Sequence, residues 1–237
     1  MEADLKISVE QGVKEVVVRK GVANDVHIPN GILISDLTID CVSEYLSKEG
    51  VDEAEIKNSF VVFSYEEKSI ELLFAARILN PDSIGGKIRL HPDLQKFEIN
   101  GGKRYTPFKL ADFIRMNRHF FESKDQAIKL ENVLRNFIAD VDKKIEVSDD
   151  KRANVKASII QQVKTNIPEN FTLLLPIFVG VEPIPVKVEI DIDSTDISCS
   201  LMSPDLKELI DKETKVIIDF ELKLIKQLFP ELRIFQK

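Results

Sequence analysis

Histidine is the side chain best suited to general acid–base chemistry near neutral pH, and the chain has three of them. His27 lies in a predicted turn, His91 precedes a proline, and His119 lies near the end of a predicted helix. None of them has an acid or a nucleophile at the spacing of a known catalytic motif, and the sequence has no glycine-rich phosphate-binding loop. The residues therefore predict a protein without enzymatic activity and without a cofactor.

The acidic run formed by Asp191, Asp193 and Asp196 comes nearest to a metal site, because hard cations bind several oxygen ligands. The run lacks the glycine of a calcium-binding loop, and Met202 stands where that loop needs a bidentate glutamate. The run also passes from a strand into a turn, which separates the first two side chains from the third. We therefore expect a solvated strand face and no metal site.

Basic side chains gather in one stretch of this acidic chain. Arg115, Arg118 and His119 fall at positions i, i+3 and i+4, which predicts that they share one helical face. Lys103 and Arg104 lie just upstream. Such a face is able to hold a phosphate or an acidic partner, while an ordinary solvated helix surface is the alternative. If the protein binds nucleic acid, this cationic face is the expected site.

The composition is that of a globular protein and limits its partners. The chain has 237 residues, 43% of them hydrophobic and 31% charged, with a formal net charge of -7. This negative charge repels phosphate backbones and disfavours nucleic acid as a partner. Cys41 and Cys199 form no metal-binding pattern, so we expect two buried, reduced thiols. With no signal peptide or membrane-spanning run recognised, we expect a cytoplasmic protein that does not enter the membrane.

The first hundred residues are predicted to be mostly strands with one helix. Strands are expected at residues 13–19, 60–63, 70–79, 87–91 and 97–99, with a turn at 27–31. The helix is capped by Ser35 or Asp36 and ends at Gly50. The neighbouring Gly85 and Gly86 are interpreted as part of a turn.

From residue 105 onward, helices come first and strands return later. Two helices are expected to begin after the caps Thr106 and Ser123. The expected strands cover residues 171–179, 186–192, a segment up to 202, and 232–235, with a long helix before the last. Residues 154–164 fit a helix and a strand equally well.

These patterns predict an α+β protein with two regions. The first region, residues 1–104, is rich in strands. The second region, residues 105–237, has a central helical pair, an antiparallel β-meander and a long C-terminal helix. One continuous domain is the alternative to this division.

The stretch 167–180 is dense in apolar residues and carries two prolines. Pro176 has no amide hydrogen, so it predicts a sheet edge or a bulge for the strand that contains it. An apolar edge strand needs cover, either from the helix that Pro204 begins or from a second copy of the chain. The second possibility predicts a homo-oligomer whose interface residues are Phe171, Leu173, Leu175, Ile177 and Phe178.

The same stretch resembles the "IPxxF…PxFxG" pattern of the YfdQ-like family of phage and prophage proteins. Residues 108–114 resemble the start of a helix in that family, and residues 202–204 and 229–235 match its C-terminal layout. The resemblance covers residues 105–237, while residues 197–201 and the absence of a terminal glycine depart from it. It favours an extended conformation for residues 154–164, and it implies a phage or prophage accessory protein without catalytic residues to transfer.

Three functions follow as expectations. The first is a non-enzymatic interaction or sequestration protein, encoded by a phage or prophage and acting in the cytoplasm of the infected host on a host or phage protein. The second is a nucleic-acid-associated accessory of phage recombination or replication that uses the cationic face. The third is a structural or cargo protein of the virion.

Overall fold

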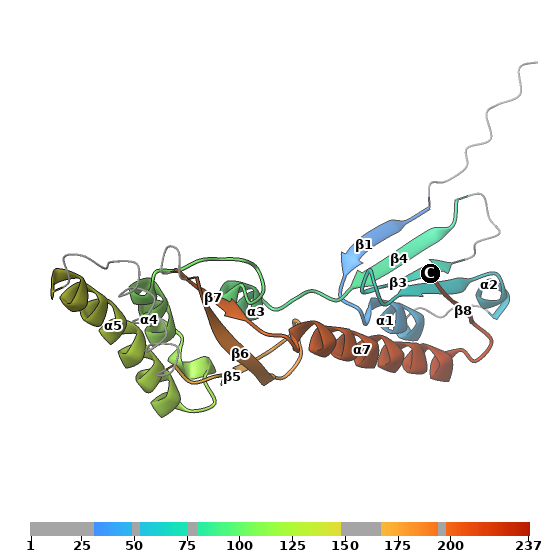
Figure 1. The fold of residues 1–237 in the computed structure, drawn as a ribbon. Coiled ribbons are helices and arrows are strands. Elements are labelled where there is room, and N and C mark those ends of the chain that lie inside the picture. The colour runs from blue at the N-terminus through green and yellow to red at the C-terminus, as the bar shows by residue number, and fades with distance from the viewer. Residues whose placement is uncertain (1–30, 49–52, 75–79, 148–166, 194–197) are drawn as a thin grey trace, which may run out of the picture. The chain divides into compact units, whose positions relative to one another are not determined.

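The computed structural model describes residues 31–48, 53–74, 80–147, 167–193 and 198–237 (Figure 1). Helices and strands both contribute to it, which confirms the predicted α+β class. Residues 31–237 belong to one compact unit. The predicted strand at 13–19, most of the predicted turn at 27–31 and the open question at 154–164 lie outside the described residues.

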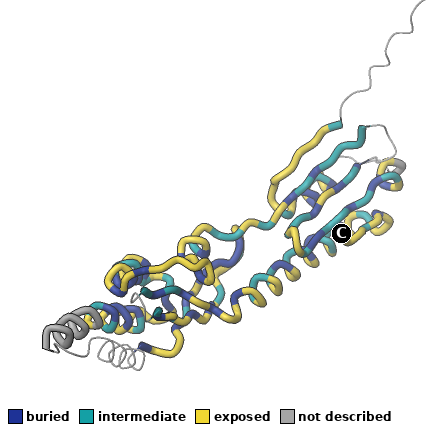
Figure 2. The backbone as a smooth tube through the Cα atoms, turned by 45° about the horizontal axis from the view of Figure 1, so that its top comes forward, coloured by how far each residue is buried: buried dark blue, intermediate teal, exposed yellow. Residues whose placement is uncertain are grey.

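A five-stranded sheet holds the N-terminal strands together with the end of the chain. Its order is β1 (Leu33–Leu37), β4 (Asp82–Lys87), β3 (Ser69–Phe74), β2 (Phe60–Ser64) and β8 (Arg233–Gln236). The strand predicted at 60–63 is found as β2 and the start of the strand predicted at 70–79 as β3, and the two pair antiparallel. The outer strands β1 and β8 pair parallel with β4 and β2. Every residue of β1 is exposed, as the yellow strand in Figure 2 shows.

The first hydrophobic core lies between this sheet and two helices, α1 (Cys41–Lys48) and the C-terminal half of α7 (Leu206–Leu228) (Figure 1). Along β3, Ile70, Leu72 and Phe74 alternate with more exposed residues, which is the pattern of a sheet with one buried face. Val42 from α1 and Ile225 from α7 are fully buried against them. The sheet and these helices therefore depend on each other for burial.

The predicted start of the first helix is wrong. Ser35 and Asp36 lie within β1, and the helix begins only at Cys41. Leu33 and Ile34 pair in register with Ser83 and Ile84, so hydrogen bonding to a distant strand outweighs the local capping signal.

The second sheet is the predicted antiparallel meander, formed by β5 (Phe171–Leu175), β6 (Ile184–Asp193) and β7 (Ser198–Met202) in that order. β5 is an edge strand and ends one residue before Pro176, as the missing amide hydrogen predicts. Two helices, α4 (Pro107–Met116) and α5 (Lys124–Val147), share the second hydrophobic core with this sheet. The predicted cap is confirmed, since the Lys109 amide donates to Thr106 Oγ1 at 3.3 Å.

Two predicted strands in residues 87–99 are wrong. The strand predicted at 87–91 shares only Lys87 with β4, and the strand predicted at 97–99 falls on the end of a short helix, α3 (Pro92–Phe97), and the turn after it. Pro92 occupies the first helical position, and the His91 Nδ1 atom accepts a hydrogen bond from the Asp93 amide at 3.1 Å. Proline together with an N-cap side chain therefore overrides the strand pattern.

Several contacts cross the boundary predicted between residues 104 and 105. The side chain of Asn100 pairs with the backbone of Ser203, and Arg104 forms an ion pair with Asp193 at 2.6 Å. The C-terminal strand β8 lies in the N-terminal sheet, where the Lys237 amide donates to the Phe63 carbonyl at 2.8 Å. The division into two regions stays a prediction. None of the helices described here is long and apolar enough to cross a membrane.

Candidate functional site

A pocket of about 470 Å³ opens at the carboxyl ends of the parallel strands β1 and β4; we call it the strand-end pocket. Ligands commonly bind at the carboxyl ends of parallel strands, because loops diverge there and leave space. Its lining residues come from the end of β1 and the β1–α1 connection, the end of β4 and the segment after it, a turn after β5, and helix α7: Asp36, Thr38, Ile39, Asp40, Lys87, Ile88, Arg89, Val179, Gly180, Val181 and Ile217.

The backbone around this pocket is tightly constrained. Asp36 has a φ of 61°, unusual for a residue other than glycine, and the β1–β4 register shifts between Ile34 and Leu37. Gly86 pairs with Leu37, and a Cβ atom added to Gly86 would lie 2.2 Å from the Thr38 carbonyl oxygen. The bulge and the glycine together bring β4 against the start of the β1–α1 connection, which forms one wall of the pocket.

Two cations stand at the rim. A guanidinium nitrogen of Arg89 donates to the backbone carbonyl of Asp36 at 2.5 Å, and Lys87 Nζ lies 3.5 Å from Asp36 Oδ1. Within the part of the chain that the structure describes, the Arg89 guanidinium has no carboxylate partner. A guanidinium bound to a neutral carbonyl keeps its charge and its remaining donors for an anion.

Apolar side chains form the larger part of the remaining wall, beside the polar Asp36, Thr38 and Asp40. Ile39, Ile88 and Ile217 are half-buried, and Val179 and Val181 lie on either side of Gly180. This turn is held against the segment after β4, since the Val179 amide donates to the Arg89 carbonyl at 3.0 Å. An apolar wall beside a cation suits a ligand with an apolar body and one anionic group.

A buried carboxylate of α7 lies against the start of α1. Glu221 of α7 is 3% exposed and accepts a hydrogen bond from the Ser43 amide at 2.9 Å. Burial raises the pKa of Glu221 above its usual range; the hydrogen bonds with Ser43 oppose this change, and the charges of Asp40 and Glu44 add to it. Burial likewise raises the pKa of the neighbouring Cys41 thiol to about 11.

Glu221→Gln is therefore expected to stabilise the protein at pH 7.5, because the amide keeps the acceptor for Ser43 and removes a buried charge. A folded-state pKa above the unfolded value means that the contribution of Glu221 to stability falls as pH rises through the folded-state pKa. The advantage of the variant should thus shrink on acidification toward pH ~5. Urea denaturation across this range measures it.

The matched control is Glu67→Gln, which removes an exposed carboxylate that pairs with Lys237 at 2.7 Å. This variant should change the free energy of unfolding by no more than about 0.5 kcal/mol at each pH. If the free energy of unfolding depends on pH identically in the wild type and in Glu221→Gln, the raised pKa of Glu221 is contradicted.

The residues of the predicted cationic face do not form one surface. Helix α4 ends at Met116, so Arg115 and Arg118 do not share a helix, and the predicted common face is wrong. Each of the four lysine and arginine side chains pairs with a carboxylate: Lys103 with Glu98 at 2.8 Å, Arg104 with Asp193 at 2.6 Å, Arg115 with Asp112 at 3.6 Å, and Arg118 with Glu131 at 2.5 Å. Their charges therefore serve contacts within the chain.

Glu131 is the centre of the largest of these networks. It is 7% exposed and also accepts a hydrogen bond from Arg135 at 3.0 Å, while Arg135 reaches Asp112 at 2.5 Å. Burial raises the pKa of Glu131, but the hydrogen bonds from Arg118 and Arg135 outweigh it and leave the pKa lowered. The network ties α4 to α5 and leaves Arg118 committed to a structural role.

The structure brings together two histidines that the sequence treats separately. His91 and His119 both line a second depression of about 510 Å³, with Phe120 and Leu174 in its wall. His91 caps α3, and the ring of His119 lies with its centre 4.0 Å from that of Phe120. Both histidines thus have structural contacts of their own, while His27 lies outside the described residues.

The predicted oligomer interface is wrong, because its residues are already buried within one chain. Phe171, Leu173, Leu175, Ile177 and Phe178 are each 0–2% exposed. They pack with residues of α4 and α5, such as Leu110 and Leu130, so this chain's own helices provide the cover. A side chain without exposed surface cannot contact a second copy of the chain.

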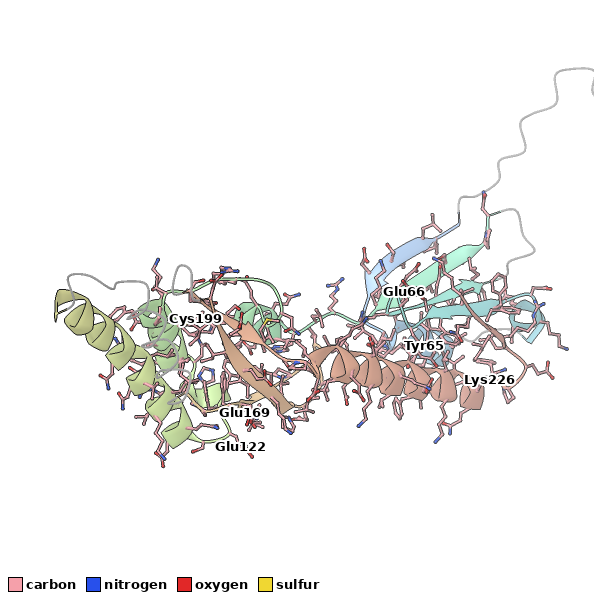
Figure 3. The ribbon with its side chains drawn as sticks, viewed as in Figure 1. Tyr65, Glu66, Glu122, Glu169, Cys199 and Lys226 are labelled. Atoms are coloured by element: carbon pink, nitrogen blue, oxygen red, sulfur yellow. The ribbon has the colours of Figure 1, made fainter. Side chains whose placement is uncertain are left out.

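The structure also locates the aspartates of the acidic run and the two cysteines. Asp191 and Asp193 lie on β6, and Asp196 lies outside the described residues. Within the described ranges, no group of three or more His, Cys, Asp or Glu side chains is arranged to hold a metal ion. Cys199 lies on β7 (Figure 3), where burial raises its pKa to about 12, and both cysteines are buried free thiols as predicted.

Sequence reasoning missed the strand-end pocket. Gly85 and Gly86 were the available signal, but they lie within β4 and not in the predicted turn. Comparison of the chain with protein-family models, curated proteins and solved structures finds no match.

Proposed function

We propose that this chain is a non-enzymatic binding protein that sequesters an organic anion with an apolar body in its strand-end pocket. The observation that carries the proposal is the Arg89 guanidinium, which has no carboxylate partner among the described residues and stands beside the apolar wall. The guanidinium binds the anionic group, and Ile39, Ile88 and Val181 contact the apolar body.

The resemblance of residues 167–180 to the YfdQ-like family supports a phage or prophage origin and action in the cytoplasm of an infected host. The ion pairs of Lys103, Arg104, Arg115 and Arg118 favour this function over binding to nucleic acid, because a phosphate backbone would have to displace a carboxylate at each of them.

The proposal predicts that Arg89→Gln weakens the binding of octanoate at least tenfold, which corresponds to about 1.4 kcal/mol. Octanoate serves as a probe because it joins one carboxylate to a short apolar chain. Isothermal titration calorimetry on the full chain measures the affinity, and added salt should weaken it.

Arg115→Gln is the matched control, since it removes an exposed arginine far along the chain from the pocket residues. Val179→Glu provides a second test, because it places a carboxylate at a wall position that is 57% exposed and thus tolerant of substitution. Equal affinities in the wild type, Arg89→Gln and Val179→Glu, or no heat of binding in any of them, would rule the proposal out.

A further inference from the structure

The outer face of helix α7 exposes large apolar side chains. Val216 is 55% exposed and Phe220 is 62% exposed, whereas Ile218 and Ile225 on the opposite side are fully buried. An exposed phenylalanine and valine one turn apart on a charged helix are typical of an interaction site.

These two residues belong to a longer row along the helix. Counting in steps of four and three places Leu209, Glu213, Val216, Phe220, Lys223 and Gln227 on one face, which we call the α7 seam. Such alternating steps are the spacing of the contact positions in a coiled coil. Among the six, Leu209 and Glu213 are half-buried and the other four are exposed.

The order of residues in the α7 seam makes it complementary to itself. We propose that the seam binds a second copy of this chain, with the two helices antiparallel and crossing near residue 218. Val216 then packs against the partner's Phe220, and Glu213 faces the partner's Lys223. The two-fold axis repeats both contacts. Two apolar layers therefore lie in the middle, with one Glu–Lys pair on each side of them.

A parallel arrangement lacks this match. It would place Glu213 opposite the same glutamate and Lys223 opposite the same lysine, and like charges at facing positions repel. Charge complementarity therefore favours a second copy of this chain as the partner and an antiparallel arrangement of the two helices.

Two hydrogen bonds hold helix α7 in place beside the seam. The Tyr65 hydroxyl donates to Asp219 Oδ1 at 2.5 Å, and Lys226 Nζ donates to the Leu232 carbonyl at 2.6 Å; Figure 3 labels Tyr65 and Lys226. The Asp219 bond raises the pKa of Tyr65 to about 12, so this contact persists at neutral pH. The α7 seam is therefore presented on a helix that is fixed to the sheet.

The size of the seam sets the expected strength. A single helix pair with two apolar layers buries less surface than the roughly 1,200–2,000 Å² of a stable specific complex. The dimer should accordingly be reversible and should depend on protein concentration.

Sedimentation velocity of the full chain over a concentration series tests the proposal. The wild type should shift from monomer to dimer, and Phe220→Glu should remain a monomer over the same range. Met116→Glu is the matched control, because Met116 is 72% exposed and lies outside the seam, so it should dimerise as the wild type does.

A charge exchange tests the antiparallel direction. Glu213→Lys alone and Lys223→Glu alone should each raise the dimer dissociation constant at least tenfold, whereas the double variant should restore it. Circular dichroism confirms that each variant is folded. A wild type that stays monomeric throughout, a Phe220→Glu variant that dimerises normally, or a double variant that stays as weak as the singles would overturn the proposal.

Discussion

Gly86→Ala is expected to lower the free energy of unfolding by about 3 kcal/mol. An added Cβ would lie 2.2 Å from the Thr38 carbonyl oxygen and 2.9 Å from Cys41 Sγ, and the nearest of these atoms belongs to the backbone. The clash is relieved only if β4 moves away from the β1–α1 connection. Urea denaturation followed by circular dichroism measures the loss.

The neighbouring glycine provides the control. A Cβ added to Gly85 meets nothing closer than the Ile70 carbonyl oxygen at 3.8 Å, an ordinary contact. Gly85→Ala should therefore leave stability unchanged or raise it by about 0.5 kcal/mol, since alanine restricts the unfolded chain. Equal losses in the two variants would contradict the close approach at Gly86.

Phe171→Ala is expected to destabilise the protein by about 3–5 kcal/mol. Its ring is 2% exposed and stacks on that of Phe121, with centroids 5.2 Å apart. The loss combines the burial of a large apolar side chain with the cavity that its removal leaves. Because the contacts lie within one chain, the loss in denaturation experiments should not depend on protein concentration.

Leu174→Ala is the control on the same strand, where the side chain is 37% exposed. It should cost about 1 kcal/mol or less, because less apolar surface leaves water at this position. A loss for Phe171→Ala that shrinks on dilution would instead favour the oligomer interface that the sequence predicts, because stabilisation by a second copy falls with protein concentration.

The fold class was predictable because its signals are local. Thr106 with Pro107 marks the start of α4, and alternating apolar and charged residues mark β6. Other elements depend on distant partners. β8 pairs with β2 across most of the chain, and no pattern near Arg233 indicates which sheet it joins.

The candidate site was not predictable for the same reason. The strand-end pocket exists because β1 and β4 pair in parallel, and their partners Ile34 and Ile84 are far apart in sequence. The sequence did identify Arg118 as a basic residue of interest. It gave no sign that Glu131, from the following helix, would neutralise it.

The strand-end pocket is the central claim, and its location is tested most directly by nuclear magnetic resonance. Octanoate titrated into the ¹⁵N-labelled full chain should shift the amide signals of Thr38, Lys87, Arg89 and Gly180, which line the pocket. The same titration of Arg89→Gln should shift them far less. Shifts confined to residues around His91 and His119, or no shifts at saturating octanoate, would contradict the account.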